Sequence, residues 1–195
     1  MPYPAKTDPD QILETAIQIL ERDGREALSM RKLAEALNLK APSLYRHYAD
    51  RNALEQAIAA RAARQLHDAL ERAIRPLRST GKVLHQTART YCGFAKTHPE
   101  LYDLIMTNSI PANFPPTNFT PANISEGKHL WNFVLEVIGR ITTNPDDTSA
   151  AVALWSFLHG FVTLERNGLF GPSGPHNALE VGIKALIAGL PKTRV

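Results

Sequence analysis

The chain has 195 residues, 44% of them hydrophobic, and carries a formal net charge of +3. This length and apolar content are enough to bury the core of one helical domain or of two small ones. The single cysteine, Cys92, excludes an internal disulfide, and so small a net charge does not by itself select a class of partner.

The first ten residues, MPYPAKTDPD, lack the apolar segment of a secretory signal. The apolar run at 150–164 is interrupted by Ser156, His159 and Thr163, and it is shorter than the roughly 18 to 20 residues that a bilayer span needs. We therefore expect a cytoplasmic protein with no membrane contact, in which this run forms a buried helix.

A first helix is predicted over 9–23, because Leu13, Ala16 and Leu20 recur with the spacing of one helical face. Gly24 follows the last of these positions and is typical of a helix C-terminus. The pattern therefore predicts one amphipathic helix at the start of the domain.

Two short helices are predicted next. Ser29 is a good N-cap for the first of them, and Asn38, which tolerates left-handed backbone, stands where that helix should end. Pro42 suits the first turn of the other, which must end near Tyr48 because Asp50 is the expected cap of a following helix. Two short helices joined by a tight turn form a helix-turn-helix motif, which we place at 29–48.

The rest of the chain is predicted to be helical apart from one long loop. A helix over 51–75 ends before Pro76, and Thr97 with Glu100 forms a predicted capping box for a helix that starts at Pro99. Four prolines within 110–122 predict a loop. The other helical patterns cover 83–95, 131–141, 144–167 and 175–190. We therefore predict an all-α fold of about nine helices.

The polar face of the third helix is a candidate DNA-binding surface, because a major groove accepts one α-helix. Ser43 and Arg46 are suited to base edges, and Lys40, Tyr45 and His47 to phosphates. Ala41 and Pro42 lie on the same exposed side, and Arg51 adds a cation at the start of the next helix. The alternative is that these side chains only form the solvated face of a helical bundle.

Residues 29–54 resemble the DNA-reading segment of the TetR-type, tetracycline-repressor-like transcriptional regulators. Asn38 stands where that family usually has glycine, and Arg51 where it usually has lysine. The close resemblance covers about residues 8–58. The matching residues are Ser29, Arg31, Leu33, Ala34, Pro42, Ser43, Leu44, Tyr45, His47, Tyr48, Arg51 and Leu54.

The resemblance implies a repressor whose helix-turn-helix domain, residues 1–50, binds double-stranded DNA. Residues 51–195 would then form a helical domain that binds an unidentified small effector and a second copy of the chain. It also adds Ser29 and Arg31 to the candidate DNA-binding residues. The later part resembles a subgroup with the pattern W-x-x-x-H-G, here Trp155, His159 and Gly160.

A homodimer that reads a palindromic operator is expected, because one short helix gains little affinity from one half-site. The run at 150–164 and the small residues of the last helix are the candidate interface, although both helices can instead be buried within one subunit. The candidate interface residues are Trp155, Leu179, Gly182, Ile183, Leu186 and Gly189.

An aromatic-lined cavity with a few polar groups suits a small apolar or aromatic effector that releases the DNA. Each candidate lining residue can equally be an ordinary core residue. The candidates are Tyr91, Phe94, His98, Tyr102, Met106, Phe133, Trp155 and His159.

We expect no enzymatic activity, metal or cofactor. The seven histidines lack a metal-ligand spacing, and no His-Glu-x-x-His or paired-cysteine motif occurs. Cys92 and His98, as nucleophile and base, stand six positions apart and do not share a helix face. The alternative function is that of a helical interaction protein without sequence-specific DNA binding, which salt-dependent binding to a palindromic fragment would distinguish.

Overall fold

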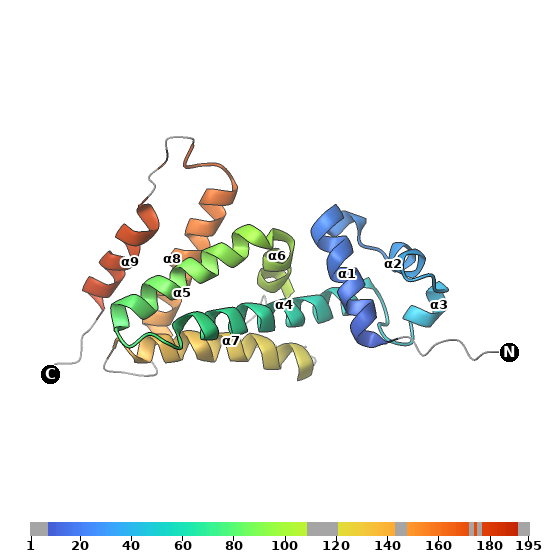
Figure 1. The fold of residues 1–195 in the computed structure, drawn as a ribbon, viewed down its shortest axis with the longest axis horizontal. Helices are drawn as coiled ribbons and strands as arrows, with labels where there is room; N and C mark the ends of the chain where they lie inside the picture. Colours follow the sequence, from blue (N-terminus) through green and yellow to red (C-terminus); the bar gives the residue numbers. More distant parts are fainter. Residues whose placement is uncertain (1–7, 109–120, 143–147, 172–173, 175–176, 191–195) are drawn as a thin grey trace. The chain divides into compact units, whose positions relative to one another are not determined.

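A computed structural model of the chain describes residues 8–108, 121–142, 148–171, 174 and 177–190. Over these residues the elements are nine α-helices and one 3-10 turn, which confirms the predicted all-α class (Figure 1). None of the helices in this part of the chain is both long and apolar enough to cross a membrane. The chain divides into two compact units, Met1–Ala63 with His98–Gly127, and Arg64–Thr97 with Lys128–Val195.

The first unit is built around helix α1. The helix packs against α2, α6 and the 3-10 turn η1, and Ile12, Ala16 and Leu20 on its inner face are fully buried. This apolar face is what the spacing of the sequence predicts. The elements are α1 (Pro9–Asp23), η1 (Arg25–Ala27), α2 (Met30–Ala36), α3 (Ala41–Leu44), the first part of α4 (Arg51–Ile74) and α6 (Pro99–Asn108).

In the second unit, α5 packs against α8 and α9, and α8 packs against α9. Phe157 of α8 lies against Gly182 of α9, where an added Cβ atom would come within 2.1 Å of the ring. The two helices therefore approach closely because position 182 has no side chain. The elements are the second part of α4, α5 (Thr80–Thr97), α7 (Pro121–Gly139), α8 (Thr148–Arg166) and α9 (Ala178–Gly189).

Two predicted helix ends differ from the structure. The α-helical part of α3 ends at Leu44 rather than near Tyr48, because the Leu44 carbonyl accepts from the amides of both His47 and Tyr48, at 2.9 and 3.0 Å, and the last turn tightens. The capping box predicted at Thr97 is wrong. Thr97 is the last residue of α5, and its hydroxyl donates to the Gly93 carbonyl of its own helix at 3.0 Å.

The predicted loop at 110–122 falls almost entirely outside the described residues, and α7 begins at Pro121, just before that range ends. The predicted start of the next helix at Asn144 also lies outside them, and α8 is described from Thr148. The other predicted helices are confirmed to within a few residues, except that the pattern at 131–141 corresponds to Pro121–Gly139, which begins ten residues earlier. For example, the prediction over 175–190 corresponds to Ala178–Gly189.

Candidate nucleic-acid interface

Helix α2 and the turn after it hold α3 in a fixed place. The Ser29 hydroxyl accepts a hydrogen bond from the Lys32 amide at 3.1 Å, so Ser29 is the N-cap that the sequence predicts. Asn38 has φ 52°, the left-handed conformation expected of it, and the following Leu39 amide donates to the Ala34 carbonyl at 2.8 Å. The chain therefore reverses within a few residues and begins α3 directly.

Helix α3 has one buried anchor, and the turn that follows it is polar and exposed. Leu44 is fully buried, whereas Tyr45 has 52% of its surface exposed and Arg46 and His47 are exposed beside it. Just before the helix, Lys40 is exposed as well. Pro42 is exposed, and Ala41 and Ser43 are half-buried. Burial of the Leu44 side chain thus fixes which face of this short helix is turned outward.

Within the described part of the chain, neither Lys40 nor Arg46 forms an ion pair. Both cations are therefore available to an anionic partner, as phosphate and base-edge contacts require. Arg31 is exposed at the start of α2 but pairs with Glu35 one turn later, with 2.9 Å between Nε and Oε1. Such an exposed pair is weak, so Arg31 can exchange Glu35 for a phosphate at little cost.

The Arg51 side chain, predicted to add a cation at the start of α4, is bonded within its own unit. Its Nε donates to Oε1 of Glu55 at 2.7 Å, and its Nη2 donates to the Arg25 carbonyl at 2.8 Å. Arg25 in turn donates to Oε2 of Glu55, at 2.6 Å from Nη2. Two guanidinium groups from η1 and α4 thus share one carboxylate, and they tie the start of α4 to the turn that precedes α2.

Glu55 is the most buried charged group described in this unit, with 5% of its side chain exposed. Burial raises the pKa of Glu55, but the hydrogen bonds from Arg25 and Arg51 outweigh that effect and leave the pKa below its ordinary value. The hydrogen bond to Glu55 also raises the pKa of Arg25. The cluster is therefore ionised at neutral pH and is held together by charge-assisted hydrogen bonds.

The candidate effector residues divide between the two compact units. His98, Tyr102 and Met106 belong to the first, in which His98 contacts the Glu21 carboxylate of α1 at 2.5 Å and Tyr102 is buried. The other candidates belong to the second unit. They are Tyr91, Phe94 and Phe133, all buried, and Trp155 with His159, whose ring centroids lie 6.4 Å apart.

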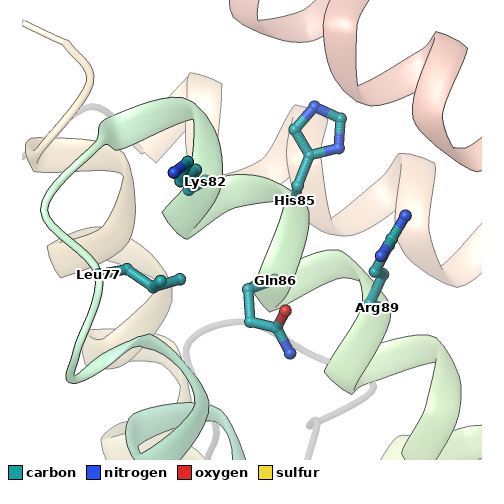
Figure 2. Close-up of a pocket in the computed structure, with 5 residues that line it drawn as sticks. All are labelled: Leu77, Lys82, His85, Gln86 and Arg89. Atoms are coloured by element: carbon teal, nitrogen blue, oxygen red, sulfur yellow. The ribbon is translucent and has the colours of Figure 1, made fainter.

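Two features of α5 were not singled out by the sequence analysis. The Thr87 hydroxyl is buried and has no hydrogen-bond partner within the part of the chain that the structure describes. On another face of α5, a recess of about 320 Å³ is lined by Leu77, Lys82, His85, Gln86 and Arg89 (Figure 2). A sequence signal for the recess exists, since the 28 residues from 72 to 99 contain six Arg or Lys and no Asp or Glu.

The predicted dimer-interface residues differ in burial within one chain. Ile183 is fully buried, and Gly182 is half-buried and lies against Phe157 of the same chain. Trp155, Leu179 and Leu186 are half-buried, and Gly189 is exposed. Other apolar side chains are more exposed in this unit than those predicted, namely Val152, Leu164, Leu169 and Val181.

The described residues show no sign of a catalytic or metal centre. Among them, no group of three or more His, Cys, Asp or Glu side chains is arranged to hold a metal ion. Burial, together with the nearby charge of Glu165, raises the pKa of the Cys92 thiol to about 12. Cys92 is therefore a protonated core residue, which makes it a poor nucleophile.

A helix-turn-helix with an exposed basic and aromatic second helix defines a class of DNA-binding proteins. Comparison with known families places the chain within that class. Residues 12–58 match the family described as bacterial regulatory proteins, tetR family, and residues 84–186 match the tetracyclin repressor-like C-terminal domain. The second match covers more than half of the 195 residues. The chain belongs to the TetR family.

Individual relatives agree with this assignment. An uncharacterised HTH-type transcriptional regulator of Mycobacterium tuberculosis is 29% identical over 167 residues, which cover 85% of this chain and 73% of that protein. The class A tetracycline repressor of Escherichia coli is 37% identical over 54 residues, 28% of this chain and 25% of the repressor.

Solved structures share the fold along almost the whole chain. A protein of unknown function from Rhodococcus sp. RHA1 has a TM-score of 0.81 at 24% identity, covering 98% of this chain and 100% of its own. A TetR variant from Acinetobacter baumannii AYE in complex with minocycline has a TM-score of 0.65 at 21% identity, covering 94% and 96%. The two family matches make the chain a DNA-binding transcriptional regulator, and they favour this function over that of a helical interaction protein.

Proposed function

We propose that the protein is a repressor that binds a palindromic operator as a homodimer and is released by a small apolar or aromatic molecule. The observation that carries this proposal is the exposed turn at the end of α3, where Tyr45, Arg46 and His47 follow the buried anchor Leu44. So short a helix contacts few base edges, and specific affinity therefore requires a second copy at a second half-site.

Within this surface, Ser43 and Arg46 are assigned to base edges, and Lys40, Tyr45 and His47 to phosphates. Ala41 and Pro42 give the start of α3 a narrow profile that fits a groove, and Ser29 and Arg31 at the start of α2 face the backbone of the DNA. Arg51 acts indirectly, because its bonds to Glu55 and the Arg25 carbonyl fix the first turn of α4 beside α3.

The proposed functional division is a DNA-binding part at 1–50 and an effector-binding and dimerisation part at 51–195, acting in the bacterial cytoplasm. The dimer contact is proposed on α8 and α9, with Trp155, Leu179, Leu186 and Gly189 at its edge. The exposed apolar side chains Val152, Leu164, Leu169 and Val181 support a partner on this unit, because side chains of this kind commonly mark contact surfaces.

The proposed effector site lies along α5, in a C-terminal part that resembles the W-x-x-x-H-G subgroup through Trp155 and His159. Thr87, Tyr91 and Phe94 recur at the i, i+4, i+7 spacing of one buried face. A buried hydroxyl without a partner is unfavourable, and a ligand that bonds to Thr87 would remove that cost. We therefore add Thr87 to the candidates as the polar contact of an otherwise apolar ligand.

The test is selection of bound fragments from random double-stranded DNA by the full chain, followed by binding measurements on the selected sequence over a series of salt concentrations. We expect a consensus with two-fold symmetry, a complex that contains two chains, and an affinity that falls steeply with salt. Failure to enrich any sequence would contradict the proposal. An asymmetric consensus bound by one chain would contradict only the dimer.

A further inference from the structure

We propose that the recess on α5 binds a small anion with two or more acidic oxygens, through Lys82 and Arg89, and that this anion competes with Glu180 for Arg89. The class comprises phosphate esters and dicarboxylates, because a guanidinium binds either group through two parallel hydrogen bonds. This site is separate from the buried effector residues, and nothing in the repressor proposal depends on it.

The recess combines an apolar wall with cationic and polar side chains. Leu77 lies in the connection between α4 and α5, and the other lining residues are Lys82, His85, Gln86 and Arg89 of α5. Figure 2 shows His85 and Arg89 projecting to the same side from successive turns of that helix. Its volume of about 320 Å³ is at the small end of the range for ligand sites, which favours a small molecule over a large one.

The charge of the recess is positive and only partly compensated. Lys82 is exposed and has no ion-pair partner among the residues that the structure describes. Arg89 pairs with Glu180 of α9, with 2.6 Å between Nη2 and Oε1 and 3.2 Å from Nε to the same oxygen. His85, between these two cations along α5, is a further polar side chain of the lining.

The N-terminus of α5 lies at the same end of the recess, and its first turn contains no acidic residue. The partial positive charge of a helix N-terminus therefore adds to that of Lys82 instead of being neutralised by the chain. Lys82, Arg89 and the N-terminus of α5 contribute positive charge, and only the carboxylate of Glu180 opposes it. The recess therefore has an excess of positive charge. An anion in the recess would balance that charge.

The carboxylate of Glu180 is an anion that is already bonded to Arg89 at the recess. Its pKa is lowered, first by the hydrogen bond from Arg89 and to a lesser degree by the nearby charge of His85. One oxygen of Glu180 takes both donors of Arg89, which is poorer geometry than one oxygen for each donor. A ligand with a bidentate group can therefore replace Glu180, and the α5–α9 ion pair would then open.

The experiment is calorimetric titration of the full chain with inorganic phosphate, pyrophosphate and malonate in separate runs, at constant low ionic strength. We expect saturable binding of one anion per chain for at least one of these probes. The comparison of pyrophosphate with malonate separates phosphate ligands from carboxylate ligands. Absence of saturable binding by all three would overturn the proposal.

Variants make the test specific to the recess. Lys82→Ala should weaken binding about tenfold or more, as loss of a charge-assisted hydrogen bond does, whereas Lys96→Ala, which removes an exposed lysine elsewhere on α5, should leave binding unchanged. Glu180→Gln should tighten binding, because it removes the competing charge while keeping the side-chain shape. Equal losses in the two lysine variants would show that the recess attracts anions only non-specifically, and unchanged binding in Glu180→Gln would exclude competition.

DNA phosphate is the other anion that a basic surface can meet. The proposal favours a small ligand because Leu77 gives the lining an apolar side chain and because Arg89 of the lining already binds a carboxylate, that of Glu180. If Lys82→Ala lowers the salt dependence of operator binding and leaves anion binding unchanged, the surface contacts DNA and the small-ligand proposal is wrong.

Discussion

Arg51, the first residue of α4, is bonded to the buried carboxylate of Glu55 one turn later on the same helix, with 2.7 Å between Nε and Oε1. The same guanidinium donates to the carbonyl of Arg25 in η1. The Arg51 side chain, which the sequence suggests as a positive charge at the DNA surface, is thus hydrogen-bonded to two groups of its own unit. Removal of the Arg51 side chain should therefore lower the stability of the fold more than the affinity for DNA.

We predict that Arg51→Gln lowers stability but leaves the dependence of operator affinity on salt unchanged. Lys40→Ala should do the opposite. It should reduce the slope of log affinity against log salt by about 1, the value for one phosphate contact, while the unfolding midpoint stays nearly constant. Fluorescence anisotropy at several salt concentrations measures the slope, and urea unfolding measures stability. A reduced slope in Arg51→Gln would mean that Arg51 contacts phosphate directly.

Glu55→Ala should destabilise the protein by about 1–3 kcal/mol, because it leaves the guanidinium groups of Arg25 and Arg51 without their shared acceptor. Glu35→Ala removes an exposed ion pair of the same chemical type and should cost less than about 1 kcal/mol. Urea unfolding of both variants tests this. Equal losses of unfolding free energy in Glu55→Ala and Glu35→Ala would show that the burial of Glu55 adds nothing to the stability of its ion pairs.

The same carboxylate predicts a pH dependence. The pKa of Glu55 in the folded protein lies below its ordinary value of 4.5, so its contribution to stability is fully present above that value and is lost as pH falls through the folded pKa. Unfolding free energies measured between pH 7 and pH 3 should therefore decrease less steeply below pH 4.5 in Glu55→Gln than in the unaltered protein. Parallel curves would contradict the lowered pKa.

Arg46→Ala should relax the preference for particular bases by about 1–3 kcal/mol at the positions that Arg46 reads. The measurement is competition binding with operators substituted one base pair at a time. A uniform loss of affinity for every sequence would instead make Arg46 a phosphate contact. Helicity should not change, because the side chain is exposed.

Thr87→Val should stabilise the protein without ligand, or leave it unchanged, because it replaces an unpaired buried hydroxyl by a methyl group of similar shape. Thr87→Ser keeps the hydroxyl and serves as the matched control, with a loss expected from the missing methyl group. Thermal unfolding measures both variants. A clear loss of stability in Thr87→Val would show that the hydroxyl has a partner in solution.

The sequence predicted the elements that depend on local chemistry. Ser29, Asn38 and Asp50 act through hydrogen bonds or backbone conformation within a few residues, and each is found where the pattern placed it. The end of α3 was less well predicted, because the spacing of apolar residues does not indicate that the Leu44 carbonyl accepts from both the His47 and the Tyr48 amides.

Features that depend on distant residues were not visible in the sequence. Nothing near Arg51 indicates that it would share Glu55 with Arg25, which is 30 positions from Glu55 along the chain. In the same way, the small residues of α9 suggested a partner subunit, whereas Gly182 accommodates Phe157 of its own chain. The spacing of small residues shows that another helix can pack closely against α9, but it does not show whether that helix belongs to the same chain or to a partner.

The four residues of α3 also limit how much sequence one subunit can specify. At about 1.5 Å per residue the helix spans about 6 Å, a little less than two steps of about 3.4 Å between base pairs. If it reads about three base pairs, a matching half-site occurs by chance about once in 64 positions, against genomes that offer about 10⁶ or more competing sites. In the proposed homodimer, two copies would make a chance match rarer, about once in 4,000 positions, and so reduce the number of competing sites about 64-fold.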